Sequence, residues 1–301
     1  MLSGIFPPLP TPFADDGALD LDGLRVNVQR LNPTGLSGYL ALGSNSEAVH
    51  LTPDEASQVF AAVRKAAAPD KLVIGGTGQF STQATIEMTK RAADAGCGAA
   101  LIITPFYYKN AMTAEALRVH YHTIADQSPI PVMIYNVPAN TGFNIAPHIV
   151  AEIAQHPNVV GMKDSAGDIN QLAETVRLTR GTPAGRDTNF SVFSGNYGAM
   201  LPGLTFGVVG AILAVANIAP DECVEIFNAF RRGDLATAGS LHLRLLPIAR
   251  AVTAQYGVPG LKAAMALLGQ VGGRPRPPLL PLGAAQRVEI EKMLKEADLL
   301  G

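Results

Sequence analysis

The sequence lacks a basic cluster, a long apolar run and a metal-binding motif, and each absence excludes a class of protein. Charged residues make up 16% of the 301 positions, and the net charge at pH 7 is -2. A nucleic-acid-binding surface needs grouped Lys and Arg side chains that neutralise phosphates. Because no such group is present, we expect no nucleic-acid partner.

Two further absences concern membranes and secretion. The most apolar later stretch, residues 207–216, is shorter than the roughly 20 apolar residues that a membrane-spanning helix needs. Residues 1–8 have neither the basic start nor the continuous apolar core of a signal peptide. We therefore expect a cytoplasmic protein without a membrane partner.

Metal ligands are also missing from the sequence pattern. Cys97 and Cys223 lie far apart in the chain, and no carboxylate accompanies His120 and His122 in an HExxH arrangement. We expect unpaired thiols and no bound metal.

Short apolar runs alternate with amphipathic stretches through most of the chain. Eight runs have the length and composition of buried strands: Ile5–Leu9, Gly38–Leu42, Leu72–Gly76, Ala99–Thr104, Val132–Tyr135, Val159–Lys163, Ser191–Phe193 and Val208–Leu213. Helices are expected between them, including Leu21–Leu31, Pro53–Ala67, Thr82–Ala95, Ala114–Asp126, Pro147–Gln155 and Asn170–Thr179. Eight such βα units predict a TIM (β/α)8 barrel, an α/β fold.

The helix starts and the C-terminal part refine this prediction. Thr52 precedes a proline and is followed by Glu55, the pattern of a capping box, and Asp168 and Ser81 are expected to cap their helices. From Pro220 onward helix follows helix, with expected breaks near Gly233 and in segments 257–260 and 272–281. We predict a catalytic barrel over residues 1–219 and a helical region over residues 220–301 packed on it.

Two consecutive predicted strands end in residues that suit Schiff-base chemistry. Lys163 follows the apolar run 157–162, and Tyr135 follows the run 130–134. The chemistry of a TIM barrel lies at the carboxyl ends of its strands, so both side chains are expected at one site. A buried amine loses the solvation that favours its charged form, which allows it to attack a ketone.

Glycine-containing loops follow the second and third predicted strands. Residues 43–47 offer backbone N–H groups and polar side chains to an anionic oxygen, although an ordinary βα turn has a similar composition. Residues 75–78 lack the ending of a P-loop and the acidic residue of a dinucleotide fingerprint. We interpret them as a close backbone approach rather than a phosphate site.

Four motifs follow one another in the chain, at residues 42–47 (LGSNSE), 104–108 (TPFYY), 135–142 (YNVPANTG) and 161–165 (GMKDS). Together they resemble the dihydrodipicolinate synthase and N-acetylneuraminate lyase family of class I pyruvate-dependent aldolases. The resemblance extends from Phe6 to Leu299. It implies a small-molecule 2-oxo acid substrate and a covalent imine on Lys163, with no cofactor.

The resemblance also implies roles for individual residues. Lys163 is expected to attack the C2 ketone, and Tyr135 to shuttle protons near the resulting cationic imine. Ser44 is expected to link Tyr135 to Tyr107 in a proton relay. Because the family pattern has this last tyrosine reaching in from a neighbouring protomer, a homotetramer built from dimers is implied.

A second group of residues is implied in substrate binding: Asn45, Ser46, Asn140, Ser165 and Ile212. The amides of Ser44 and Asn45 are expected to hold the substrate carboxylate. Ser46 stands where the family usually has glycine. If that position requires a positive φ, the serine costs about 1 kcal/mol or more and alters substrate preference.

Within this family, segments 81–89, 128–132, 155–165 and 257–262 resemble 4-hydroxy-2-oxoglutarate aldolases, which implies cleavage to pyruvate and glyoxylate. Synthases of the family usually carry an arginine in place of Asn140, which holds the carboxylate of aspartate semialdehyde, so the asparagine argues against the synthase reaction. Three alternatives remain: a dihydrodipicolinate (4-hydroxy-tetrahydrodipicolinate) synthase, a 2-keto-3-deoxy sugar acid aldolase and, from another class, a non-catalytic 2-oxo-acid sensor.

Overall fold

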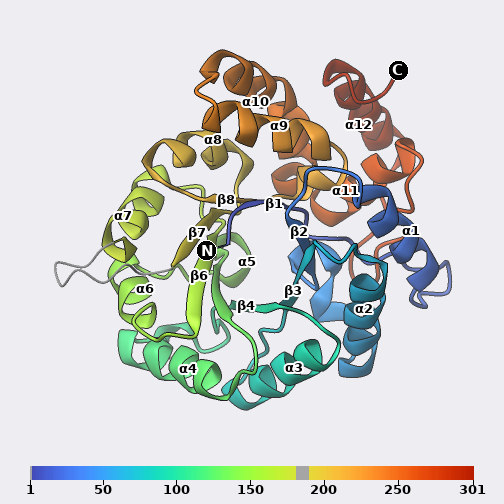
Figure 1. Cartoon of the computed structure of the whole chain (residues 1–301). Helices are drawn as coiled ribbons and strands as arrows, with labels where there is room; N and C mark the ends of the chain where they lie inside the picture. Colours follow the sequence, from blue (N-terminus) through green and yellow to red (C-terminus); the bar gives the residue numbers. More distant parts are fainter. Residues whose placement is uncertain (1, 181–189) are drawn as a thin grey trace. The chain divides into compact units, whose positions relative to one another are not determined.

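Eight parallel strands form one sheet, in the spatial order β1-β8-β7-β6-β5-β4-β3-β2 (Figure 1). The computed structural model describes residues 2–180 and 190–301. Backbone N–H groups of Ser37 and Leu40 donate to the carbonyls of Ile5 and Pro7, each at 3.0 Å, and so join the first and second strand segments. The fold is a TIM barrel with a C-terminal helical extension, as predicted.

The strands are short and lie close to their predicted positions: β1 Gly4–Phe6, β2 Gly38–Ala41, β3 Leu72–Gly76, β4 Ala99–Ile103, β5 Val132–Asn136, β6 Val159–Asp164, β7 Ser191–Ser194 and β8 Gly210–Ile212. The helices are α1 Leu21–Leu31, α2 Pro53–Ala66, α3 Thr82–Asp94, α4 Ala114–Gln127, α5 Pro138–Thr141, α6 Pro147–Ile153, α7 Ile169–Thr179, α8 Tyr197–Phe206, α9 Pro220–Arg231, α10 Leu235–Arg250, α11 Gly257–Leu267 and α12 Ala284–Glu296. In the described part of the chain, no helix combines the length and the apolar character needed to cross a membrane.

Local sequence signals explain where the helices begin. Thr52 and Glu55 form the predicted capping box at the start of α2. The side chain of Ser81 accepts the Ala84 N–H, and that of Asp168 accepts the Asn170 and Gln171 N–H groups. Each cap satisfies backbone donors that have no partner inside the helix.

Three elements differ from the sequence-based expectation. β1 ends at Phe6 because Pro7 and Pro8 have no N–H to donate to a strand ladder. α8 was not predicted, since its apolar residues occur on all sides and Pro202 lies inside it. The expected break at residues 257–260 is instead the start of α11, where Pro259 occupies an early position that needs no intrahelical N–H bond.

Backbone contacts divide the chain into two compact units. Unit 1 contains Met1–Gly4 and Ile74–Ile212, and unit 2 contains Ile5–Val73 and Leu213–Gly301. This division follows different lines from the predicted boundary between residues 219 and 220, which stays a prediction.

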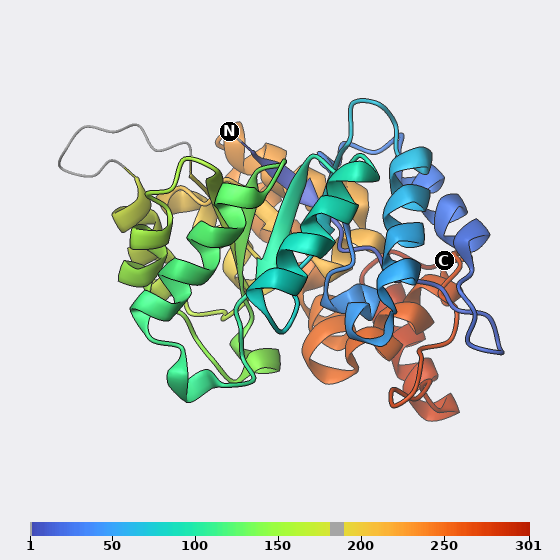
Figure 2. The same cartoon turned by 90° about the horizontal axis from the view of Figure 1, so that it is seen from below.

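Unit 1 has an apolar core between its strands and its outer helices. α3 packs beside α4, α4 beside α6, α6 beside α7 and α7 beside α8 (Figure 1 and Figure 2). A Cβ on Gly78 would lie 2.6 Å from the Ile103 backbone nitrogen, which confirms a close backbone approach in the loop after β3. The core includes the strand residues Ile102, Val132, Ile134, Met162 and Val192 and the helix residues Leu117, Ile124, Val150, Leu172 and Val176.

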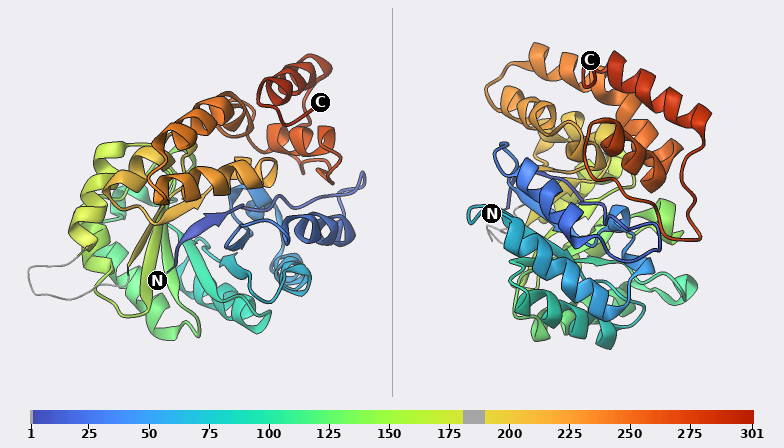
Figure 3. Two further views of the ribbon diagram at one scale, coloured as in Figure 1. Left: turned by 45° about the horizontal axis from the view of Figure 1, so that its top comes forward. Right: turned by 90° about the vertical axis from the view of Figure 1, so that its right-hand side faces the viewer.

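Unit 2 combines the first two helices with the C-terminal helices. α1 packs on α2, α9 on α10 and α11 on α12 (Figure 3). Burial of apolar side chains supplies the main stabilising free energy of such packing. The fully buried residues of unit 2 include Leu24, Val28, Phe60, Val63, Leu245, Ile248, Leu261, Ile290 and Leu294.

An ion pair connects α2 of unit 2 to the segment that follows α11. The Arg276 guanidinium donates to both carboxylate oxygens of Glu55, at 2.5 and 3.0 Å. This hydrogen bonding lowers the pKa of Glu55 to about 2. A carboxyl whose pKa is depressed by folding stabilises the protein above its unfolded pKa and loses that contribution as the pH falls through the folded pKa.

We therefore expect Glu55→Gln to lower the free energy of unfolding at pH 7 by about 1–2 kcal/mol, allowing for screening of this partly exposed pair. The glutamine keeps the capping geometry. The difference from the wild-type protein should shrink as the pH falls from about 4.5 toward about 2. Denaturant titrations across this range measure it, with Glu115→Gln as an exposed helical control; a pH-independent difference would refute the assignment.

Candidate active site

Lys163 and Tyr135 lie side by side at the carboxyl ends of β6 and β5. They are register partners in the parallel pairing of these strands, and both are buried, at 4% and 6% exposure. The Lys163 Nζ lies 4.4 Å from the centroid of the Tyr135 ring. The amine and the phenol that the sequence predicted for one site are therefore brought together within unit 1.

The loop ends of three adjacent strands surround this pair. The Ser165 N–H donates to the Asn136 carbonyl at 2.8 Å, and the Gly195 N–H donates to the Asp164 carbonyl at 2.6 Å. A Cβ on Gly195 would lie 2.0 Å from Ser165 Oγ and 2.8 Å from Lys163 Cε. Glycine is thus the residue that leaves room here for both side chains.

A buried carboxylate directly after Lys163 organises these ends. Asp164 accepts the Ala166 N–H at 2.7 Å, the Gln171 amide at 3.0 Å and the Asn136 amide at 3.4 Å. Burial raises the pKa of the Asp164 carboxyl. This network was not predicted from the sequence. One signal in the sequence could have indicated it: Asn136 and Asp164 each directly follow a candidate catalytic residue.

The remaining predicted residues of unit 1 lie at different depths. Ile212 is buried at the end of β8, and Asn140 is exposed on α5. Tyr107 is 72% exposed, and its ring centroid lies 6.5 Å from that of Phe80 and 5.0 Å from that of Tyr108. These aromatic rings form an exposed group on the loops after β3 and β4.

The predicted carboxylate-binding loop belongs to unit 2. Ser44 to Ser46 form one turn of 3₁₀ helix, in which Ser44 and Asn45 are half-buried. Ser46 is fully buried, and its hydroxyl donates to the Leu9 carbonyl. That hydroxyl is thus engaged within the protein, which does not support the predicted substrate contact of the Ser46 side chain.

Ser46 does not have the strained backbone that was considered for it, whereas Leu42 and Glu47 do. Ser46 does not have a positive φ, whereas Leu42 and Glu47 have φ values of 61° and 56°. A non-glycine residue in this region costs about 1–3 kcal/mol, and the surrounding contacts must hold it there. The condition under which Ser46 would be strained is therefore not met, and the strained residues of this segment are Leu42 and Glu47.

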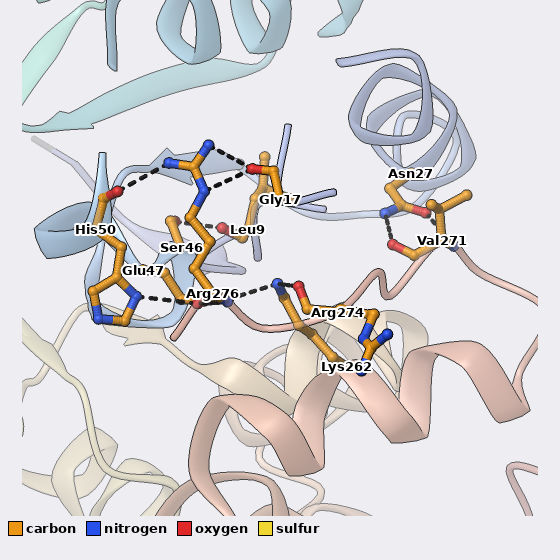
Figure 4. Close-up of polar contacts among 10 residues, drawn as sticks. All are labelled: Leu9, Gly17, Asn27, Ser46, Glu47, His50, Lys262, Val271, Arg274 and Arg276. Carbon is orange, nitrogen blue, oxygen red and sulfur yellow. Dashed lines mark hydrogen bonds and ion pairs between the residues drawn. The ribbon is translucent and has the colours of Figure 1, made fainter. Parts of the chain in front are cut away.

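Glu47 has a fully buried side chain that lies between the loop and the C-terminal part of unit 2 (Figure 4). Its carboxylate forms an ion pair with Lys262 at 2.5 Å and accepts the Arg276 N–H at 2.8 Å. The His50 Nδ1 lies 3.2 Å from the same carboxylate. Burial lowers the pKa of the Lys262 amine.

Comparison with known proteins identifies the family. The model of the dihydrodipicolinate synthetase family matches residues 1–297. A 4-hydroxy-tetrahydrodipicolinate synthase from Methanothrix thermoacetophila is 39% identical over 100% of this chain and 99% of its own. The crystal structure of the dihydrodipicolinate synthase from Thermotoga maritima superposes with a TM-score of 0.93 at 32% identity, covering 100% of both chains. A prophage protein of the same family from E. coli K12, crystallised with pyruvate, gives a TM-score of 0.92 at 30% identity over 99% of both chains.

These findings correct the predicted function. Relatives with 36–39% identity over nearly their full length carry the name 4-hydroxy-tetrahydrodipicolinate synthase, not 4-hydroxy-2-oxoglutarate aldolase. Asn140 alone does not exclude the synthase reaction. A single charge-assisted contact contributes about 1.5–3 kcal/mol, so its absence lowers affinity for one substrate without excluding the reaction.

The family membership also bears on the chemistry. Enzymes of this family form a covalent Schiff base on a lysine and use no external cofactor, in agreement with the chemistry predicted from the sequence. Members of this family are lyases, so the alternative of a non-catalytic 2-oxo-acid sensor is set aside. With a full-length family match and relatives of this identity, the chain belongs to the dihydrodipicolinate synthetase family of class I aldolase-type lyases.

Proposed function

We propose that this protein is a 4-hydroxy-tetrahydrodipicolinate synthase, which condenses pyruvate with aspartate semialdehyde. The observation that carries the proposal is the buried pair of Lys163 and Tyr135, with 4.4 Å between the amine and the ring. Its support from relatives is the name shared by the curated proteins that match over nearly the full chain. The predicted cytoplasmic location stays a prediction.

In the proposed mechanism, the neutral Lys163 amine attacks the C2 ketone of pyruvate. Loss of water from the carbinolamine forms an imine, which acts as an electron sink. Loss of a proton from C3 then gives an enamine whose carbon attacks the aldehyde of the second substrate. Attack of the substrate's own amine on C2 releases the lysine and closes the ring.

Proton transfer is assigned to two tyrosines and a serine. Tyr135 delivers and removes protons during carbinolamine formation, since its ring lies beside the amine. We assign Ser44 and Tyr107 to a relay that connects this phenol with solvent. Tyr107 is exposed with Phe80 and Tyr108 in a single chain, as expected of a group covered by a second protomer. We therefore propose a homotetramer built from dimers.

Different residues are assigned to the carboxylate of pyruvate, to the distal part of the second substrate and to the methyl group of pyruvate. We assign the pyruvate carboxylate to the Ser44 and Asn45 amides, and the distal part of the second substrate to Ser165, Asn140 and the Asn45 side chain. Ile212 is assigned to the apolar surface near the pyruvate methyl group. The Ser46 side chain is assigned to support of the turn, because it donates to a backbone carbonyl.

Asn140 favours a second candidate within the family, an aldolase of 2-keto-3-deoxy sugar acids. An exposed neutral amide can bind the hydroxyl groups of a sugar-derived aldehyde, whereas it lacks the charge and fork geometry that suit a carboxylate. Parallel assays of pyruvate condensation with aspartate semialdehyde and with glyceraldehyde distinguish the two candidates.

The first prediction from the proposed function concerns the nucleophile. Treatment with pyruvate and borohydride should reduce the imine to a stable amine on Lys163, and peptide mapping should locate the added mass there. Lys163→Arg should prevent labelling, whereas Lys71→Met should not. A label on Lys262, the other buried lysine beside an aromatic ring, or no label at all, would exclude the proposed mechanism.

The second prediction concerns the space around the nucleophile. Gly195→Ala places a Cβ within 2.8 Å of Lys163 Cε and should displace the amine. Displacement of a reacting group by about 1 Å can cost about 100-fold in rate. We expect imine trapping to slow by this order while far-UV circular dichroism stays unchanged. Gly239→Ala, with nothing within 4 Å of the new Cβ, is the control; equal rates for both variants would contradict this role for Gly195.

The third prediction concerns the second substrate. Asn140→Arg should add a charge-assisted contact to the carboxylate of aspartate semialdehyde and lower its KM roughly 10- to 100-fold, with the KM for pyruvate unchanged. Asn140→Gln, which stays neutral, is the matched control. No gain in the arginine variant would show that another residue binds this carboxylate, and condensation only with glyceraldehyde would favour the second candidate.

A further inference from the structure

The turn that carries the Ser44 and Asn45 amides is bounded by strained residues. Leu42 before it and Glu47 after it are two of the three non-glycine residues with φ between +20° and +160° in residues 2–180 and 190–301. Residues in this conformation persist only where surrounding contacts fix them, and they concentrate at functional sites. The contacts that fix Glu47 therefore also determine the path of the turn.

Those contacts come from the C-terminal part of unit 2, far away in the sequence. Lys262 on α11 is 2% exposed, forms the ion pair with Glu47 at 2.5 Å and donates to the Arg274 carbonyl at 2.8 Å (Figure 4). Its ammonium also lies 4.5 Å from the Phe13 ring centroid. A buried carboxylate that loses its cation is strongly disfavoured, so Lys262 stabilises Glu47 in this position.

A second set of contacts fixes the residues on either side of Glu47. The Arg276 guanidinium donates to the His50 carbonyl at 2.9 Å, and the Arg276 N–H donates to Glu47 itself. The Ser46 hydroxyl donates to the Leu9 carbonyl. Each bond joins the turn, or a residue that follows it, to a segment distant in the sequence, and satisfies a buried polar group.

We propose that Glu47 and Lys262 are positioning residues, whose buried ion pair holds the Ser44–Ser46 turn in the conformation that binds the carboxylate of the 2-oxo acid. The inference rests on the proposed function, which assigns that carboxylate to the turn. Neither residue acts on the reacting carbons. Loss of the pair should therefore weaken carboxylate binding and leave the amine chemistry of Lys163 unchanged.

The test compares a substrate that has the carboxylate with one that lacks it. Borohydride trapping of the imine is measured against the concentration of pyruvate and of methyl pyruvate, its neutral ester. In Lys262→Met, half-saturation with pyruvate should require roughly 10- to 100-fold more substrate, the loss expected for hydrogen bonds to a charged group. The maximal trapping rate and the half-saturation with methyl pyruvate should match those of the wild-type protein.

Lys71→Met is the matched control. Lys71 is also a buried lysine of unit 2, but its ammonium donates to the carbonyls of Thr34 and Leu36, at 3.0 and 2.8 Å, and not to the turn. This variant loses a buried cation as well, and it should keep the wild-type half-saturation with both compounds. A change that reflects only general loosening of the unit would occur in both lysine variants.

The double variant Glu47→Gln with Lys262→Met removes the unpaired charge and keeps the shape of both side chains. It should recover part of the affinity for pyruvate. If Lys262→Met does not fold, half-saturation with pyruvate and methyl pyruvate is measured in the double variant instead. Equal weakening for pyruvate and methyl pyruvate, or unchanged half-saturation in folded Lys262→Met, would overturn the proposal. Absence of trapping in the wild-type protein would instead overturn the proposed function.

Discussion

The register between β5 and β6 is the constraint on which the candidate site depends. In a parallel sheet, side chains alternate between the two faces, so a slip of one residue would direct one of the pair away from the other. Pairing of Tyr135 with Lys163 places both on the same side of adjacent strands. The hydrogen bonds that continue this register past the strand ends also fix Ser165 and Gly195 beside the lysine.

Each unit has one buried carboxylate that stabilises a loop, and the two carboxylates do so by different means. Asp164 in unit 1 is surrounded by neutral donors, namely a backbone N–H and the amides of Gln171 and Asn136. Glu47 in unit 2 has a cation, Lys262, together with a backbone N–H. Desolvation of a carboxylate is costly unless hydrogen bonds or a counter-ion compensate it. Both arrangements therefore make the loop conformation depend on residues that are distant in sequence.

The correction of the predicted activity shows how far one residue can support a functional assignment. Asn140 is exposed on the short helix α5 and lacks the charge expected of a synthase. In the proposed function its effect is limited to one contact with one substrate, whereas the covalent chemistry is assigned to the buried amine and phenol. The family follows from several motifs in order along the whole chain, whereas Asn140 is a single exposed side chain.

The sequence by itself determined the barrel, the helix starts and the pair of Lys163 and Tyr135, because apolar periodicity, caps and strand-end residues are local signals. It missed α8, whose residues are apolar on all sides, and it gave no sign that Leu42 and Glu47 have a positive φ. Only the tertiary structure decided that Ser46 donates to Leu9 and that Lys262 pairs with Glu47. The physical reason is that burial removes water from these groups, so their partners come from whichever segments the fold brings close, and no local pattern records that choice.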